Sequence, residues 1–137
     1  MTKAIKRLGV PDKIINMINA IYKEPNYTIV DKDTTTDPRI QRAGIRQGCP
    51  LSPYLFIVLM TVIMYDVEMG LTEREQEVVE SNKLHKQVSG KLFYADDTII
   101  MAKTAEAVEI ILHQIETESN KHALKLNQNK CIHIQMN

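Results

Sequence analysis

The sequence predicts an α+β fold in which helices pack on one face of a mainly antiparallel sheet. Apolar residues recur at helical spacing in several segments, and other segments rich in β-branched and aromatic residues are interrupted by turn residues. The expected order of elements is helix, helix, hairpin, helix, hairpin, helix, strand. A chain of 137 residues fits one domain, residues 1–137, and is long enough to bury a core.

The composition excludes several classes of protein. A hydrophobic fraction of 44% argues against disorder or a fibre, and the zero net charge gives no overall basic balance of the kind that marks nucleic-acid binding. Cys49 and Cys131 lie far apart and form no metal-ligand cluster, so buried thiols in a reducing compartment are expected. No apolar stretch follows Met1, which argues against a signal peptide. The expected location is intracellular, in the nucleus or the cytoplasm.

The first two expected helices meet at Gly9. Residues 3–8 have the pattern of a helix end, and glycine is a common stop. This abrupt start suggests that the domain continues upstream. Pro11 suits the first turn of the second helix, and Asp12 is favourable beside the positive helix end. The residues expected to form its buried stripe are Ile14, Ile15, Ile18, Ile21 and Tyr22.

A first hairpin is expected next, with arms at residues 27–30 and 39–42 joined by the turn-rich segment 31–38. A glycine- and proline-rich loop at residues 43–53 then leads into a helix. Ser52 could cap that helix, and Pro53 suits its first position.

Residues 54–65 are nearly all apolar, which predicts a helix buried on most sides and ending near Gly70. The apolar stretch is shorter than the ~20 residues of a membrane span, so no membrane partner is expected. Arg39, Arg42 and Arg46 form a basic strip without acidic residues before the helix, which suits a phosphate. A capped core helix preceded by an arbitrary loop is the alternative.

The last third of the chain predicts helix and strand in alternation. Residues 71–89 are charged and indicate an exposed helix or a long loop. Thr104 can cap a later helix with an apolar face, and Cys131–Met136 alternates like a half-buried strand. The residues of the helix's apolar face are Val108, Ile111, Leu112 and Ile115.

The most informative segment is 92–101, in which two apolar arms flank Asp96 and Asp97. The arms predict a tight hairpin with the aspartates at its tip. Adjacent carboxylates repel each other, and a divalent cation with oxygen ligands, such as Mg²⁺, offsets that repulsion. A solvated Asp-Asp turn is the alternative.

Three segments in order resemble the reverse transcriptase family. Residues 44–56, Gly-Ile-Arg-Gln-Gly-Cys-Pro-Leu-Ser-Pro-Tyr-Leu-Phe, resemble the signature that precedes the long palm helix. Residues 94–97, Tyr-Ala-Asp-Asp, resemble the catalytic hairpin, and residues 124–131, Leu-Lys-Leu-Asn-Gln-Asn-Lys-Cys, resemble the lysine-bearing segment that follows. The residue sequence of the first segment is most similar to that of non-LTR (LINE-type) retrotransposon enzymes. The resemblance covers essentially the whole chain.

The resemblance implies part of a right-hand polymerase palm that transfers nucleotides by a two-metal mechanism with Mg²⁺, or Mn²⁺ in its place. It also implies an RNA template, a DNA primer and a dNTP as partners. By the same resemblance, Asp96 is the main metal ligand and Asp97 the less direct one, while Lys130 is the general acid for the departing pyrophosphate. Without the resemblance, spacing alone favours a solvated lysine at position 130.

The resemblance further assigns a nucleotide- and template-binding group. Gln47 and Gly48 would contact the incoming nucleotide and the template, and the small Gly48 would allow close approach. Arg46 adjoins these two residues. Tyr94 and Ala95 would lie near the primer end.

The chain also departs from the family pattern. The family requires a further aspartate on a strand before the first helix, and Asp31, Asp33 and Asp37 fall in the wrong place to supply it. The fingers and thumb segments are likewise missing. The expectation is therefore a truncated piece that binds Mg²⁺ weakly, does not polymerise alone and works only within its full-length parent. A non-catalytic retroelement remnant that binds nucleic acid or acts structurally is the alternative, and an RNA-templated RNA polymerase is a weaker one.

Overall fold

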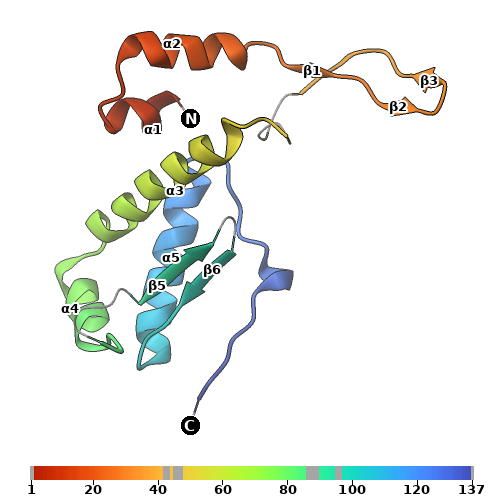
Figure 1. The fold of residues 1–137 in the computed structure, drawn as a ribbon. Helices are drawn as coiled ribbons and strands as arrows, with labels where there is room; N and C mark the ends of the chain where they lie inside the picture. Colours follow the sequence, from red (N-terminus) through yellow and green to blue (C-terminus); the bar gives the residue numbers. More distant parts are fainter. Residues whose placement is uncertain (1, 42–43, 45–47, 86–89, 95–96, 137) are drawn as a thin grey trace. The chain divides into compact units, whose positions relative to one another are not determined.

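The structure is a computed structural model that describes residues 2–41, 44, 48–85, 90–94 and 97–136. The chain divides into two compact units, Met1–Val62 and Ile63–Asn137, which are described separately. Figure 1 shows the elements in order along the chain. The described residues contain five α-helices and three antiparallel two-stranded ladders, which confirms the α+β class. These strands do not join into one layered sheet as expected.

The first unit is built around the helices α1 (Thr2–Arg7) and α2 (Asp12–Ile21). Gly9 separates them and takes a φ of +75°, a left-handed conformation that glycine adopts without steric cost, so the predicted stop is confirmed. A buried cluster joins these helices to the start of α3 (Ser52–Met69). Its fully buried members are Ile5, Ile15 and Leu55, and its partly buried members are Val10, Ile18, Tyr22, Leu51 and Val58.

The stripe predicted on α2 is narrower than expected. Ile15 is buried, but Ile14 and Ile21 are 47% and 46% exposed. Both lie at one edge of the helical stripe and outside the buried cluster. Pro11 was expected in the first turn of α2. It is instead the N-cap residue, because the helix begins at Asp12.

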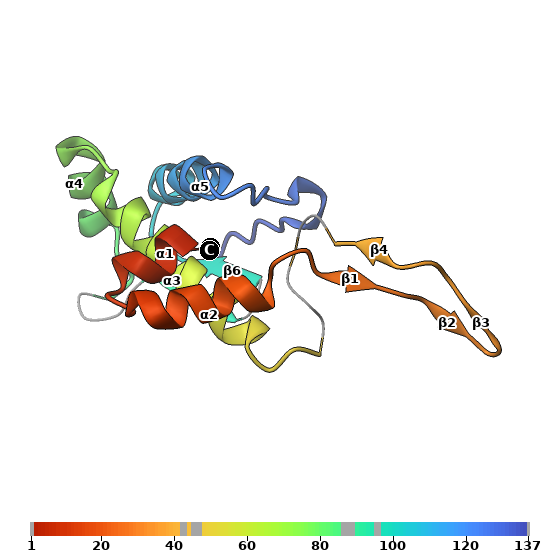
Figure 2. The ribbon, with the colours of Figure 1, turned by 90° about the horizontal axis from the view of Figure 1, so that it is seen from above.

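The first hairpin is confirmed but is divided into two short ladders. β1 (Asn26–Tyr27) pairs with β4 (Arg39–Ile40), and β2 (Val30–Asp31) pairs with β3 (Thr34–Thr35). Figure 2 shows the two ladders following one another along a single hairpin. All eight strand residues are exposed, so the cross-strand bonds rather than a packed face maintain this arm.

Helix α3 is buried on one side only, so the prediction of burial on most sides is wrong. Apolar residues lie on all sides of α3, and the neighbouring elements cover only some of them. The buried residues are Ser52, Leu55, Leu59, Val62, Ile63 and Val67. The large exposed residues are Tyr54, Ile57, Tyr65 and Met69.

By length and composition, α3 is long and apolar enough to cross a membrane, because its 18 residues extend beyond the apolar stretch seen in the sequence. A core helix meets the same criterion, and α3 contributes Leu55 to a buried cluster. The criterion therefore supports no membrane assignment.

The second unit contains α4 (Glu73–Ser81), α5 (Ala105–Asn120), the strands β5 (Lys91–Tyr94) and β6 (Asp97–Ile100), and the 3₁₀ turn η1 (Gln128–Lys130). Helix α4 packs against α5, and α5 packs against β6. The predicted cap of α5 is confirmed, since the Thr104 hydroxyl accepts from the Ala107 N–H at 3.4 Å. Of the predicted apolar face, Ile111 and Ile115 are buried and Val108 and Leu112 are half-buried.

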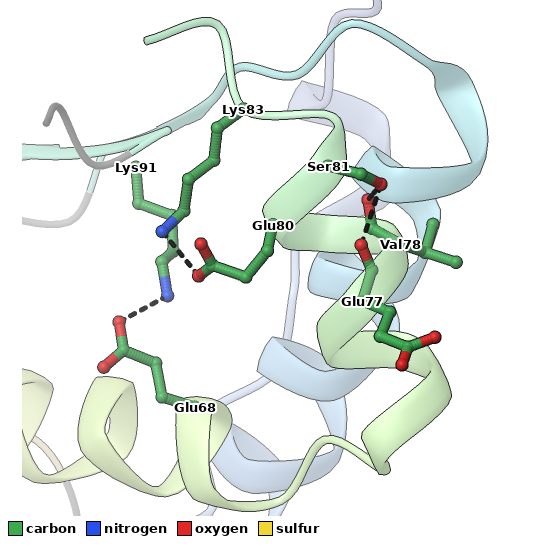
Figure 3. A network of polar contacts seen from close by, with 7 residues as sticks. All are labelled: Glu68, Glu77, Val78, Glu80, Ser81, Lys83 and Lys91. Carbon is green, nitrogen blue, oxygen red and sulfur yellow. Dashed lines mark hydrogen bonds and ion pairs between the residues drawn. The ribbon is translucent and has the colours of Figure 1, made fainter. Parts of the chain in front are cut away.

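Helix α4 is fixed at both ends by local hydrogen bonds. Thr72 and Glu75 form a capping box, in which the Thr72 N–H donates to the Glu75 carboxylate at 2.8 Å and the Glu75 N–H donates back to the Thr72 hydroxyl at 3.4 Å. At the other end, the Ser81 hydroxyl donates to the carbonyls of Glu77 and Val78 at 2.7 and 3.1 Å (Figure 3). The choice between helix and loop for residues 71–89 is thus decided for 73–81.

The strand predicted at Cys131–Met136 is wrong. These residues form no strand within the described part of the chain, and Ile132, Ile134 and Met136 are strongly exposed. A strand requires hydrogen-bond partners on a neighbouring strand, and the β5–β6 ladder has only its two members. Alternation of apolar residues alone therefore does not produce a strand here.

Gly90 lies at the base of the β5–β6 hairpin, where the backbone is closely packed. A Cβ at this position would collide with the carbonyl oxygen of Met101, which is backbone and cannot rotate away. We expect Gly90→Ala to lower the free energy of unfolding by about 1–3 kcal/mol in urea denaturation, as other overpacking changes do. Gly70→Ala is the matched control: its Cβ would collide with the end of the flexible Gln114 side chain, so the loss should be smaller. Equal losses for the two variants would contradict the close approach at Gly90.

Candidate functional site

The β5–β6 hairpin places Asp97 at one end of a four-residue ladder. Its register pairs Lys91 with Ile100, Leu92 with Ile99, Phe93 with Thr98 and Tyr94 with Asp97. Asp97 is thus the first residue of β6 and lies directly opposite Tyr94. The predicted hairpin is confirmed. Ala95 and Asp96, which were expected to complete its tip, lie outside the described residues.

The end of this hairpin is open to solvent. Tyr94 is 82% exposed, and Asp97 is also exposed. Among the residues that the structure describes, none forms an ion pair with Asp97. Its carboxylate oxygens are therefore accessible to a cation.

The opposite end of the hairpin is closed by backbone hydrogen bonds. The Met101 N–H donates to the Gly90 carbonyl at 2.6 Å, directly beyond the pair of Lys91 and Ile100. The Lys103 N–H donates to the Asn82 carbonyl at 2.9 Å, which ties the exit of the hairpin to the end of α4. The hairpin is thus held at its base, while Tyr94 and Asp97 at the other end of the ladder are exposed.

The glycine loop belongs to the first unit and is only partly described. Gly48 has a φ of +78°, and nothing lies within 4 Å of the position a Cβ would take. A residue without a side chain in open space allows another molecule to approach the backbone closely. Arg46 and Gln47, predicted beside it, lie outside the described residues, as does Arg42 of the expected basic strip.

A buried hydrogen-bond group anchors the loop just after Gly48. The Tyr22 and Ser52 hydroxyl oxygens lie 2.9 Å apart, and Ser52 is only 3% exposed. The Tyr22 hydroxyl also donates to the Cys49 Sγ at 3.7 Å. Ser52 was expected to cap α3, but it is the first residue of the helix and its hydroxyl faces Tyr22 instead. The sequence carried no signal for this group, because 30 positions separate Tyr22 from Ser52.

This group lowers the pKa of the Cys49 thiol. The main cause is the Tyr22 hydroxyl, which stabilises the thiolate by hydrogen bonding, followed by the backbone N–H of Leu51. Both cysteines are free; Cys49 is half-buried and Cys131 is exposed, so the expectation of a buried thiol is wrong for Cys131. Cys131 follows η1, and it is exposed together with the rest of the described terminal segment, residues 131–136.

Lys130 ends η1 and is exposed. Its backbone N–H donates to the Asn127 carbonyl at 2.9 Å. Across the described ranges, no packing between elements joins η1 to β5 or β6. The role expected for Lys130 beside a departing phosphate stays a prediction.

Of the predicted site residues, the structure brings together Tyr94 and Asp97. No group of three or more His, Cys, Asp or Glu side chains within the described residues could hold a metal ion. The donor chemistry of Asp97 nevertheless fits Mg²⁺ or Mn²⁺, because a solvent-accessible carboxylate is the ligand these hard cations prefer. Asp31 and Asp33 lie on or between β2 and β3 in the other unit, away from the β5–β6 ladder in the sequence.

Comparison with protein families identifies the family to which a chain with this hairpin and this glycine loop belongs. The model of the family described as reverse transcriptase (RNA-dependent DNA polymerase) matches residues 2–136. The chain therefore belongs to the reverse transcriptase family.

Two relatives show to which proteins of retrotransposable elements the chain is similar. It is 30% identical over 129 residues to the retrovirus-related Pol polyprotein from type-1 retrotransposable element R2 of Nasonia vitripennis. It is 22% identical over 129 residues to the retrovirus-related Pol polyprotein from type-2 retrotransposable element R2DM of Drosophila melanogaster. Both alignments cover 93% of this chain, but only 12% and 11% of the relatives. The expected relationship to retrotransposon reverse transcriptases of the non-LTR type is confirmed.

The hydrogen bond from Tyr22 to Cys49 can be tested through thiol reactivity. In a Cys131→Ser background, we expect the rate of iodoacetamide alkylation of Cys49 to rise with pH at a midpoint below that of an ordinary thiol. Tyr22→Phe removes the donor to the thiolate, so it should move this midpoint upward. Tyr54→Phe, which removes an exposed hydroxyl from the same region of α3, should leave it unchanged. An identical midpoint in the Tyr22→Phe variant would contradict the bond.

Proposed function

We propose that residues 1–137 form part of the palm of an RNA-directed DNA polymerase of a non-LTR retrotransposon, working on an RNA template, a DNA primer and a dNTP. The observation that supports this most is the β5–β6 hairpin, which presents Asp97 opposite Tyr94 at an accessible tip within a chain of the reverse transcriptase family. A two-stranded hairpin beside α5 is consistent with part of an antiparallel palm sheet packed on helices. An intracellular location, in the nucleus or the cytoplasm, is part of the proposal.

The carboxylates at this tip are proposed as the metal ligands of the polymerase. Asp97, together with Asp96, would hold Mg²⁺, and Mn²⁺ offers the same oxygen preference. A bound divalent cation in such a site activates the attacking hydroxyl and neutralises charge on the phosphates. The aspartates contribute the negative charge that attracts the cation, and the exposed Tyr94 beside them offers a surface for the primer end, together with Ala95.

The remaining residues are assigned by family resemblance. Gly48, whose backbone is accessible, is proposed to lie against the incoming nucleotide and the template together with Gln47, with Arg46 contributing positive charge. Lys130 is proposed as the general acid for the departing pyrophosphate, a role compatible with its exposed side chain.

We propose further that polymerisation requires residues beyond these 137. A two-metal site depends on a carboxylate that bridges both ions, and the described residues assemble no group of three acidic ligands. The relatives extend far beyond the aligned segment, which leaves ample chain to supply such a ligand.

Primer extension tests this proposal. The 137-residue chain alone should not extend a DNA primer on an RNA template, because we propose that a further metal ligand comes from residues outside it. When residues 1–137 replace the aligned segment of an active reverse transcriptase of the family, Mg²⁺-dependent extension should be retained. Asp97→Asn or Asp96→Asn in that fusion should reduce the rate ~100-fold or more, as expected for a group that stabilises charge in the transition state.

The controls separate the two parts of the proposal. Template–primer binding by the fusion, measured by filter retention, should be unaffected by either substitution. A fusion that binds but never extends would contradict the polymerase assignment and favour a binding module. Metal-dependent extension by the isolated chain, abolished by Asp96→Asn, would contradict the requirement for further residues.

A further inference from the structure

The ion pair between Lys91 and Glu68 joins the base of the β5–β6 hairpin to α3. The Lys91 Nζ lies 2.9 Å from the Glu68 Oε1, and 23 positions separate the two residues. Figure 3 shows Lys91 extending from the start of β5 toward the carboxylate at the end of α3. The Lys91 side chain is only 12% exposed, whereas that of Glu68 is 64% exposed. The pair therefore couples a lysine that has lost most of its water to a solvated carboxylate.

Among the described elements, the hairpin packs on one helix besides the contact made by this pair. Three of the four residues in each strand are exposed, including Leu92, Phe93 and Ile99. Within the described residues, β5 packs on β6 and β6 packs on α5. Lys91 adds a direct link from β5 to a second helix. An isolated two-stranded hairpin is only marginally stable, so such links decide where its tip points.

Lys91 and Asp97 lie at opposite ends of the same ladder. Lys91 pairs with Ile100 at the base, and Tyr94 pairs with Asp97 at the tip. Three residue steps separate the two pairs, about 10 Å at strand spacing. A small tilt at the base is therefore amplified at the tip, where a misplacement of about 1 Å can cost ~100-fold in rate.

We propose that Lys91 is a positioning residue of the polymerase site, which holds the hairpin through Glu68 so that Asp97 stays where a divalent cation is bound. This inference rests on the function proposed above. Lys91 itself touches neither the cation nor the nucleic acid; it acts through the ladder.

The direction of the effect distinguishes positioning from simple electrostatics. Removal of a positive charge near a cation site favours cation binding by Coulomb's law, because one source of repulsion disappears. Loss of a residue that positions a ligand weakens binding instead, by about 10–100-fold for groups that orient metal ligands. Lys91→Met keeps the aliphatic stem and removes only the charge, so the two explanations predict opposite changes.

The matched control, Lys83, is labelled in the same view. Lys83 pairs with Glu80, three positions before it at the end of α4, and this pair does not involve the hairpin (Figure 3). Lys83→Met thus makes the same change of charge and side chain in the same region without affecting the base of β5.

Mn²⁺ titration of the ¹⁵N-labelled 137-residue chain tests the inference. Paramagnetic broadening of the Tyr94 and Asp97 amide signals reports where the ion binds, and the Mn²⁺ concentration at half loss reports how tightly. We expect Lys91→Met to raise that concentration about 3–5-fold, less than for a group that touches a metal ligand, because Lys91 acts through the ladder and its partner Glu68 is solvated. Lys83→Met should leave it unchanged, and Lys91→Arg, which keeps the charge, should restore it to within a factor of about two of the original chain.

Three further variants keep the test decisive if Lys91→Met does not fold. Glu68→Gln should weaken binding, but the loss of its negative charge predicts the same direction, so the decision rests on Lys91→Glu. That variant adds negative charge and should nevertheless weaken binding, while the exchanged pair Lys91→Glu with Glu68→Lys should recover part of it. Unchanged or tighter Mn²⁺ binding in Lys91→Met, Lys91→Glu or Glu68→Gln would overturn the inference, as would equal effects of Lys91→Met and Lys83→Met.

Amide hydrogen exchange separates failure of this inference from failure of the proposed function. If Mn²⁺ does not broaden the hairpin signals of the unmodified chain, the metal site of the proposed function fails. In that case faster exchange across β5 and β6 in Lys91→Met than in Lys83→Met would still support the anchoring role, and equal exchange would overturn it.

Discussion

The ladder between β5 and β6 is the constraint on which the chemistry proposed for this chain depends. It places Asp97 opposite Tyr94 and closes at the other end with the short bond from the Met101 N–H to the Gly90 carbonyl. Since most of the hairpin surface is exposed, its position is decided at its base, where Gly90 admits the close backbone approach and Lys91 reaches Glu68. The end that carries Tyr94 and Asp97 is exposed, and the supporting contacts lie at the other end.

Helix α3 shows how one apolar segment serves each unit of the chain. Its first half contributes Leu55 to the cluster with Ile5 and Ile15, and its second half contains the fully buried Ile63 and Val67. A helix that is apolar all round has more sides than these elements cover, which leaves Tyr54 and Tyr65 exposed. The reverse transcriptase relatives are much longer than this chain, so exposed apolar side chains on a shared helix are consistent with a polymerase segment.

Local signals predicted much of the fold, whereas distant contacts were out of reach. The turn at Gly9, the cap at Thr104 and the arms around Asp97 each depend on a few neighbouring residues, and each was confirmed. The capping box of Thr72 and Glu75 was equally local and was overlooked. The alternation of apolar and polar residues at 131–136 predicted a strand that does not form. A strand also needs a partner strand, which no pattern within the segment can supply.

The same distinction applies to the candidate site. The hairpin around Asp97 followed from the pattern of its arms, but Tyr22–Ser52 and Lys91–Glu68 join residues 30 and 23 positions apart. Only the folded chain brings such pairs together. These contacts support the glycine loop and the hairpin, and they explain how residues remote from the motifs stabilise them.

Anomalous X-ray scattering from crystals of the chain soaked in MnCl₂ tests the central claim, that the carboxylates of the β5–β6 hairpin bind a divalent cation. We predict an anomalous peak at coordination distance, ~2.1 Å, from a carboxylate oxygen of Asp97 or Asp96. The peak should be lost in crystals of the Asp96→Asn, Asp97→Asn double variant. A Mn²⁺ peak elsewhere in the chain, with both hairpin carboxylates free of metal, would contradict it.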